Sequence, residues 1–342
     1  MIAICAGREQ AMQNPIDAFL AQRPVMILDG ALATELESRG ADLQDPLWSA
    51  KYLIEQPQLI RAVHLDYFRA GADVAITATY QLTFEACARR GIDSRAAAQL
   101  MRDGVALAIA AREEFWSVTA NRTGRLRPLV AASVGPYGAM LADGSEYRGR
   151  YALNDDALAD FHRPRLRVLA SAGADLLACE TIPCLREALL LAQMLREFPG
   201  VCAWMSFSCR DGERTSEGES IAACAAALRD YPQVAAVGVN CTAPQHIASL
   251  LQRLREATDK PLLVYPNSGE TYDPSSKRWS GPADARGVDV RGAPAPGAVA
   301  PPFAEMARLW YAAGARLIGG CCRTGPLDIR GVRQCLIREQ LL

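Results

Sequence analysis

Short apolar segments recur along the chain, and longer amphipathic stretches separate them. Each short segment is nearly continuously apolar, which is typical of a parallel strand buried on both faces. The pattern predicts strands at residues 25–28, 73–77, 129–133, 175–179, 201–207, 234–239, 261–265 and 316–318. Helical periodicity predicts helices between them at residues 58–70, 96–115, 155–171, 186–198, 245–257 and 303–313.

Three of the predicted helices end in the sequence Ala-Gly-Ala, at residues 70–72, 172–174 and 313–315. Glycine at that point suits the left-handed cap that ends a helix and turns the chain into the next strand. The alternation of strands and helices predicts an α/β protein, a single-domain (β/α)8 TIM barrel. An open doubly wound sheet is the alternative. It is disfavoured because the sequence LDGAL at residues 28–32 lacks the G-x-G-x-x-G pattern.

The barrel is expected to span residues 23–342. Residues 1–22 precede the first predicted strand, and we expect a loose, disordered or short helical lead-in there. Residues 270–301 are rich in Gly, Pro and Ala and contain little to bury. A loop of that length in a compact domain is usually a lid or a disordered segment.

Composition narrows the possible partners. The 342 residues include 37 Lys and Arg against 38 Asp and Glu, a net charge of −1. This balance argues against a nucleic-acid-binding protein and against a polybasic membrane anchor. No apolar run approaches the roughly 18 residues of a membrane-spanning helix, and the first residues do not resemble a secretory signal. We therefore expect a cytoplasmic protein that binds neither nucleic acid nor membrane.

Cysteine is frequent, with 11 residues, and three cysteines follow predicted strands. Cys241 follows the sixth strand, and Cys321 and Cys322 follow the eighth. Functional residues of a barrel lie past the carboxyl ends of its strands, so these thiols could converge. Neighbouring side chains of a strand point to opposite faces, so both thiols of the pair reach one ion only if the backbone leaves β geometry. Gly319 and Gly320 permit that departure and a close approach of the main chain.

Three cysteines with one open position fit a catalytic zinc site. The alternative is that these cysteines are buried core residues, the usual environment of a free thiol. No histidine is well placed as a fourth ligand, because His64 and His162 lie within predicted helices and His246 opens one. Burial in the core is the interpretation for the remaining cysteines, which are Cys5, Cys87, Cys179, Cys184, Cys202, Cys209, Cys224 and Cys335.

The charge of such a site indicates its chemistry. Zinc with three thiolates carries about −1, which disfavours hydroxide formation and suits a further thiol. A substrate thiol bound there loses its proton and becomes a nucleophile. Such a thiolate should attack a soft carbon electrophile, most naturally the methyl group of a positively charged donor.

Acidic and polar residues follow other predicted strands. Asp29 and Glu180 each end an apolar strand and are candidates for binding the ammonium group of an amino acid. A salt bridge is the alternative for both, and a helix N-cap is a further one for Asp29. The polar segments 133–136 and 266–269, which contain Ser133 and Asn267, could bind a carboxylate or form ordinary turns. Four aromatic residues could face a cation or pack in the core, namely Trp48, Tyr80, Tyr137 and Tyr265.

The sequence resembles the homocysteine S-methyltransferase family over about residues 24–330. The motifs that carry the resemblance are LDGALATELESRG (28–40), VGPYGAMLADGSEYRG (134–149), LLACET (176–181), VGVNC (237–241), YPNSGE (265–270) and AGARLIGGCCRT (313–324). They are most similar to the bacterial and plant branch, which uses S-methylmethionine as methyl donor and S-adenosylmethionine as a second donor. The resemblance implies a (β/α)8 barrel and one Zn²⁺ per chain, held by Cys241, Cys321 and Cys322.

The resemblance also implies that Asp29 and Glu180 contact the amino group of homocysteine, with Thr77 and Ser133 as further pocket residues. We therefore expect zinc-dependent methyl transfer from S-methylmethionine or S-adenosylmethionine to L-homocysteine, which forms methionine, by a monomer or small homo-oligomer. The same chemistry with selenocysteine as acceptor or a betaine as donor is one alternative. A non-catalytic barrel that senses thiols or metals is another.

Overall fold

Eight of the described strands form one parallel sheet that closes into a barrel. The computed structural model describes residues 14–45, 47–269, 271–273, 278–280 and 303–342. The 8-stranded sheet has the order β1-β10-β7-β6-β5-β4-β3-β2, and a parallel bridge between Leu28 and Val74 joins its two ends. The strands are β1 (Met26–Ile27), β2 (Val74–Ile76), β3 (Leu129–Val134), β4 (Leu176–Ile182), β5 (Ala203–Phe207), β6 (Val234–Asn240), β7 (Leu262–Tyr265) and β10 (Ala315–Ile318). The predicted barrel is confirmed, and the open sheet is excluded.

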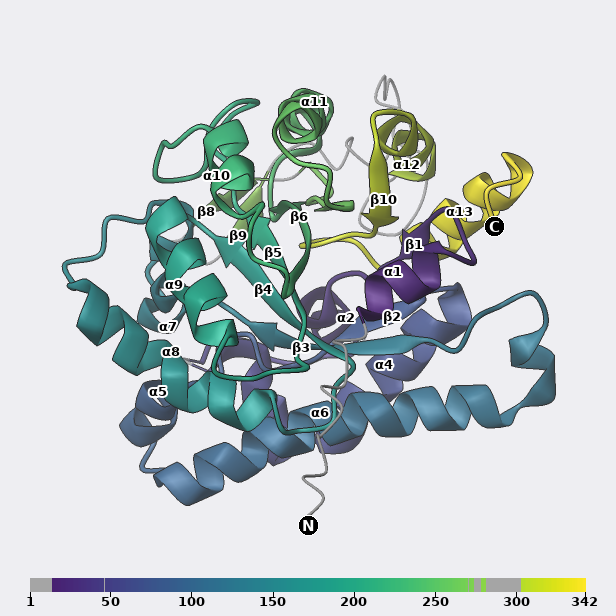
Figure 1. Ribbon diagram of the computed structural model, residues 1–342. Helices are drawn as coiled ribbons and strands as arrows, with labels where there is room; N and C mark the ends of the chain where they lie inside the picture. The colour runs from purple at the N-terminus through teal and green to yellow at the C-terminus, as the bar shows by residue number, and fades with distance from the viewer. Residues whose placement is uncertain (1–13, 46, 270, 274–277, 281–302) are drawn as a thin grey trace, which may run out of the picture.

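Helices surround the strands, as Figure 1 shows. The longer ones are α4 (Pro57–Ala70), α6 (Ser94–Ser117), α8 (Asp155–Leu169), α9 (Leu185–Leu195), α11 (Ile247–Ala257), α12 (Phe303–Ala312) and α13 (Pro326–Arg338). Shorter helices are α1 (Pro15–Leu20), α2 (Leu32–Ser38), α3 (Tyr52–Glu55), α5 (Phe84–Arg89), α7 (Tyr137–Leu141) and α10 (Ile221–Ala227). Single 3-10 turns are η1 (Trp48–Lys51), η2 (Thr119–Arg122), η3 (Ser145–Tyr147) and η4 (Pro244–His246).

A glycine follows three of these helices; Gly71 is the C-cap of α4 as the sequence predicts, whereas α8 ends earlier, with Ala170 as its C-cap. Gly71, Gly173 and Gly314 have φ values of 123°, 89° and 107°, in the region that side chains disfavour. At Gly71 the backbone N–H donates to the carbonyls of Phe68 and Tyr67, which closes the end of α4. The left-handed residue then redirects the chain toward the next strand.

The short helix α1 packs against one part of the core. Its buried residues Ile16 and Phe19 belong to an apolar cluster that also contains Trp204 of β5 and Leu263 of β7. Asn14 caps the helix, because its side chain accepts a hydrogen bond from the backbone N–H of Ile16. The described part of the predicted lead-in is therefore an ordered helix, and residues 1–13 lie outside the described residues.

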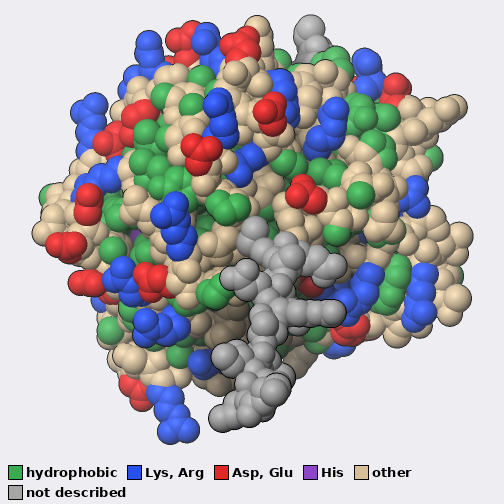
Figure 2. Space-filling model, in the orientation of Figure 1, with side chains coloured by type: hydrophobic (Ala, Val, Ile, Leu, Met, Phe, Trp, Pro, Cys, Tyr) green, Lys and Arg blue, Asp and Glu red, His purple; other side chains and the backbone are tan. Residues whose placement is uncertain are grey.

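Most of the predicted loop at residues 270–301 also lies outside the described residues. Its described parts are β8 (Thr271–Asp273) and β9 (Arg278–Ser280), which pair antiparallel. On the face shown in Figure 2, acidic and basic side chains are interspersed. Among the described residues, no helix is both long enough and apolar enough to cross a bilayer.

Candidate metal centre and active site

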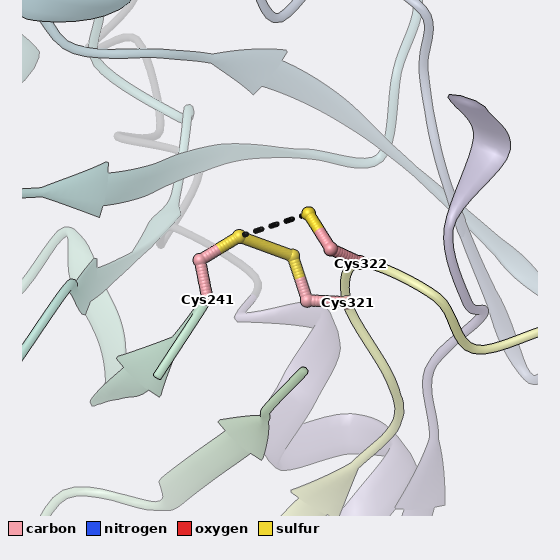
Figure 3. A group of neighbouring side chains, drawn as sticks. All are labelled: Cys241, Cys321 and Cys322. Carbon is pink, nitrogen blue, oxygen red and sulfur yellow. Dashed lines mark hydrogen bonds between the residues drawn. A yellow bond between two sulfur atoms is a disulfide. The ribbon is translucent and has the colours of Figure 1, made fainter. Parts of the chain in front are cut away.

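Three cysteine side chains meet at one end of the barrel (Figure 3). Cys241 follows β6, and Cys321 and Cys322 follow β10, which lies two positions away in the sheet. The three Sγ atoms all lie within 4.8 Å of one another. Cys241 and Cys321 form a disulfide, and the Sγ of Cys322 lies 3.9 Å from that of Cys241. The structure thus brings together the three thiols that the sequence singled out.

The spacing of these sulfur atoms suits a metal ion once the disulfide is reduced. Thiolates that share one zinc ion at about 2.3 Å sit roughly 3.8 Å apart in tetrahedral geometry, close to the separation of Cys322 and Cys241. Burial raises the pKa of the Cys322 thiol to about 12, so metal binding would displace its proton. The other described cysteines, by contrast, are buried in the core as predicted, and Cys5 lies outside the described residues.

Backbone hydrogen bonds hold the cysteines in place. Cys241 has a positive φ of 45°, which turns its side chain away from the direction that a continued β6 would give. Its N–H donates to the carbonyl of Tyr265 over 3.2 Å, and the N–H of Cys321 donates to the carbonyl of Pro266 over 2.7 Å. The N–H of Ser268 donates to the carbonyl of Cys322 over 3.1 Å. The segment after β7 therefore links the two cysteine-bearing segments.

The two glycines before the cysteine pair serve close packing. Neither Gly319 nor Gly320 has a positive φ. A Cβ on Gly319 would lie 2.5 Å from the Cβ of Leu28, and one on Gly320 would lie 2.1 Å from the Oγ1 of Thr324. Both roles that the sequence suggested are observed, because β10 ends at Ile318 and the backbone has left β geometry before Cys321, and because the main chain packs closely here.

Asp29 is a buried carboxylate beside the cysteines. Its side chain is only 2% exposed, and its Oδ2 accepts a hydrogen bond from the backbone N–H of Ile76 over 2.8 Å. Its Oδ1 has no hydrogen-bond partner among the described residues. Burial, aided by the charge of Glu180, raises its pKa well above the usual range. The N-cap alternative is wrong, because Ala31 is the N-cap of α2.

Glu180 is the second buried carboxylate. Burial raises its pKa to about 7, although hydrogen bonds from Ser133 and Tyr265 favour the charged form. The Oγ of Ser133 donates to the Oε1 of Glu180. The backbone N–H of Ser133 donates to the Oγ1 of Thr77 over 3.0 Å, so a chain of polar groups orients the acid. Among the described residues, Asp29 and Glu180 form no salt bridge, which leaves the structural alternative without support.

A cavity of about 300 Å³ joins the acids to the thiols. Its walls include Asp29, Thr77 and Glu180 together with Cys241 and Cys321. The segments after β1 and β3 supply most of the remaining wall. Its size is at the lower end of the range for small-molecule sites, which suits a ligand as small as an amino acid.

Some of the other predicted candidate residues line the cavity, and the others lie near it without lining it. Of the aromatic residues, Trp48, Tyr80 and Tyr265 line the cavity, whereas Tyr137 packs against Tyr151 and Phe161. Ser133 lies behind Glu180 and is not part of the wall. Asn267 is not part of it either, and its backbone N–H donates to the carbonyl of Thr242 over 3.1 Å.

Two residues that sequence reasoning missed belong to this region. Glu146 of η3 lines the cavity, although it does not follow a strand directly. Asn240 accepts a hydrogen bond from the backbone N–H of Thr181 over 2.7 Å and donates one to its Oγ1 over 2.8 Å. Thr181 has a positive φ of 59°, so the amide of Asn240 holds an unfavourable backbone next to Glu180. Asn240 is the last residue of β6 and directly precedes Cys241, and this position was its one available signal.

Comparisons with known proteins agree with this geometry. Residues 26–336 match the profile of a protein family described as homocysteine S-methyltransferase. Homocysteine S-methyltransferase YbgG of Bacillus subtilis (strain 168) is 53% identical over 319 residues, covering 93% of this chain and 96% of that protein. Selenocysteine Se-methyltransferase of Brassica oleracea var. italica is 44% identical over 327 residues, covering 92% and 90%.

The structure is also similar to solved structures of the homocysteine methyltransferase MmuM from Escherichia coli. The metallated form aligns with a TM-score of 0.80 at 47% identity, covering 94% of this chain and 99% of that chain. The oxidised form aligns with the same TM-score and coverage at 46% identity. A barrel whose rim holds three clustered thiols beside a cavity with two buried carboxylates defines the class, a (β/α)8-barrel enzyme. The chain belongs to the homocysteine S-methyltransferase family.

Proposed function

We propose that the enzyme transfers a methyl group from S-methylmethionine, or from S-adenosylmethionine, to the thiol of L-homocysteine. The observation that carries this proposal is the set of three Sγ atoms within 4.8 Å beside a cavity lined by Asp29 and Glu180. We further propose that Cys241, Cys321 and Cys322, once reduced, hold one Zn²⁺ per chain. Zinc bound by three thiolates would take the substrate thiol as its fourth ligand and keep that thiol deprotonated.

The protein's own residues bind and orient the amino acid. Asp29 has an unpartnered buried oxygen, so an ammonium group would supply the hydrogen bond that this oxygen lacks. Glu180 is held in one orientation by Ser133 and can accept a second hydrogen bond from the same ammonium group. A nearby cation also lowers the pKa of both acids and favours their charged forms. No general base is required of the protein.

The donor accounts for the charge balance of the reaction. The bond from the donor sulfonium sulfur to its methyl carbon breaks, and its electron pair stays on that sulfur. The acceptor thiolate forms the new bond to carbon. A cation and an anion thus become two neutral thioethers, so a dry cavity favours the reaction over the same step in water.

The first test measures zinc content and methionine formation on the same reduced sample. S-methylmethionine, S-adenosylmethionine and glycine betaine are compared as donors, and homocysteine and selenocysteine as acceptors. We expect turnover with a sulfonium donor and homocysteine, and about one zinc per chain. Preference for selenocysteine would favour the activity named for the Brassica relative. Zinc binding without turnover of any pair would contradict the proposal.

Serine substitutions test the metal ligands. Cys241→Ser, Cys321→Ser and Cys322→Ser should each lose zinc and turnover, because each removes one of three thiolates. The matched control is Cys184→Ser, in which a buried cysteine lies at the N-cap of α9, where serine is favoured. The control should keep both zinc and activity. Full zinc content in any of the three ligand variants would refute the assignment of that cysteine.

A further inference from the structure

The cavity beside the cysteines has an unbalanced charge. Six carboxylate residues line it, and its described wall contains no Lys, Arg or His. Two of these acids form ion pairs with arginines. The Oδ1 of Asp45 lies 3.4 Å from the Nη1 of Arg90, and the Oε2 of Glu37 lies 3.9 Å from the Nη1 of Arg323. The remaining wall acids are Asp29, Asp42, Glu146 and Glu180. A wall of this composition favours a ligand with more than one positive group.

Glu146 is the wall acid whose role the binding of homocysteine does not explain. It belongs to η3, which follows β3 and α7 in the chain. The Oγ of Ser208 donates to its backbone carbonyl over 2.9 Å. Gly138 packs so closely that a Cβ there would lie 2.5 Å from the backbone nitrogen of Glu146. These contacts fix the backbone of Glu146 and therefore the position of its Cα atom on the cavity wall.

One oxygen of the Glu146 carboxylate lacks a hydrogen-bond partner among the described residues. This atom, Oε2, is buried. The nearby Arg148 is engaged elsewhere, because it donates to the carbonyl of Asp143 over 3.0 Å and pairs with that residue's carboxylate at 3.4 Å. Burial raises the pKa of Glu146 to about 7, because the charged carboxylate loses its hydration. The charged form of this acid is therefore destabilised. A bound cation would stabilise the charged carboxylate.

Glu146 shares one cavity with two of the cysteines. The residue lines the same wall as Tyr80, Cys241 and Cys321. Tyr80 packs edge-to-face on Trp48, with ring centroids 6.3 Å apart, and both rings line the cavity. A positive group between these rings and the thiols would therefore lie within reach of the Glu146 charge.

We propose that Glu146 determines specificity for the methyl donor, because its carboxylate recognises the positive charge of a sulfonium group. This inference rests on the proposed function and names the residue that separates a sulfonium donor from a neutral thioether. The donor is cationic before methyl transfer and neutral afterwards, so the carboxylate binds the donor and releases the product. The positive charge on the donor sulfur already declines in the transition state, so Glu146 stabilises the bound donor at least as much as the transition state. Loss of its charge should therefore raise the KM of the donor more than it lowers kcat.

The test compares two ligands that differ by one methyl group and one charge. Isothermal titration of reduced, zinc-loaded protein measures the Kd of S-methylmethionine and of methionine, without acceptor and therefore without turnover. In Glu146→Gln we expect the Kd of S-methylmethionine to rise at least about tenfold, and that of methionine to change less than about threefold. Glu146→Asp keeps the charge and should recover part of the loss.

Steady-state kinetics with homocysteine complete the test. The KM of the donor should rise in Glu146→Gln in step with its Kd, while the KM of homocysteine and the zinc content stay near those of the wild type. The control is Glu217→Gln. Glu217 lies outside the cavity wall and accepts a hydrogen bond from the backbone N–H of Arg150 over 3.0 Å, near the same segment. This variant should bind S-methylmethionine like the wild type.

Each outcome separates this inference from the proposed function. Equal weakening of both ligands in Glu146→Gln, or equal weakening in Glu217→Gln, would show a change in loop position and overturn the inference. A wild type that binds both ligands equally would also overturn it. If S-methylmethionine binds in a Glu146-dependent manner but no donor methylates homocysteine, the inference stands and the proposed function fails.

Discussion

Gly320→Ala is expected to damage the cysteine cluster through one steric contact. The added Cβ would lie 2.1 Å from the Oγ1 and 2.6 Å from the Cβ of Thr324, whereas such atoms normally pack at about 3.5 Å. A rotamer change moves the hydroxyl of Thr324 but leaves its Cβ in place. The backbone on one side of the contact must therefore move by about 1 Å. Since Cys321 is the next residue, that movement reaches the sulfur atoms directly.

The cost can be bounded from known effects of overpacking. Forcing extra carbon into a packed site typically costs about 1–3 kcal/mol, so the free energy of unfolding should fall by that amount. The proposed zinc site should be more sensitive than the fold, because ligand distances in real metal sites hold within about ±0.2 Å. We therefore expect zinc affinity to fall at least about tenfold, as it does when the support of a ligand is removed.

A double-mutant cycle isolates this contact. Thr324→Gly removes all three of the atoms nearest to the added Cβ, at the cost of the 2.6 Å hydrogen bond from Thr324 to the carbonyl of Cys321. Unfolding in urea and competition with a zinc chelator are measured for the wild type, both single variants and the double variant. In the Thr324→Gly background, Gly320→Ala should cost at least about 1 kcal/mol less than in the wild type. Additive effects, or full zinc affinity in Gly320→Ala, would refute the steric explanation.

Two further predictions concern buried polar groups away from the cysteines. Burial lowers the pKa of His64 to about 4, below the unfolded value of about 6.5, so the wild type should lose about 2 kcal/mol of stability between pH 7.5 and pH 5 through this residue. Urea unfolding at the two pH values should show that His64→Leu loses about that much less stability than the wild type between pH 7.5 and pH 5. An equal loss of stability in the variant and the wild type would contradict this prediction. Glu187→Ala leaves His162 and the N–H of Tyr137 without their 2.8 Å and 2.6 Å hydrogen bonds. It should destabilise the protein by about 3 kcal/mol in urea unfolding, and a loss under 1 kcal/mol would argue against that estimate.

The barrel strands and the helix ends were predictable because their signals are local. A strand buried on both faces needs apolar residues at consecutive positions, as in β4 and β6, where every residue is buried. Gly71, Gly173 and Gly314 each occupy a left-handed position that other residues rarely adopt. These requirements act within a few residues of the chain, so sequence alone reveals them.

The walls of the cavity were not predictable in the same way. The segment between β1 and α4 forms α2, η1 and α3, none of which has the periodicity of a long helix. Its form depends on distant contacts and side chains, such as the 2.8 Å hydrogen bond from the N–H of Asp42 to the hydroxyl of Tyr52. Glu146 was missed for the same reason, since only the folded segment after β3 places it in the cavity. Asp29 and Glu180 were found because their apolar strands fix where they lie, although β4 continues past the predicted end at residue 179 as far as Ile182.

The positions that matter most at the rim have backbone conformations that their residue types disfavour. Thr181 and Cys241 are both non-glycine residues with positive φ, and a left-handed threonine carries a further penalty for its branched Cβ. The side chain of Asn240 offsets part of that cost, because it pairs with both the N–H and the hydroxyl of Thr181. Asn240 also immediately precedes Cys241, so one residue connects the backbone beside Glu180 with the backbone that aims a thiol. Thr181 lies within β4, where the pairing with β5 shifts register between Cys179 and Ile182, and Cys241 lies just past β6. Regular strand geometry at both positions would change the directions of the neighbouring side chains. The geometry of the candidate site therefore depends on a tertiary contact that overrides local preference.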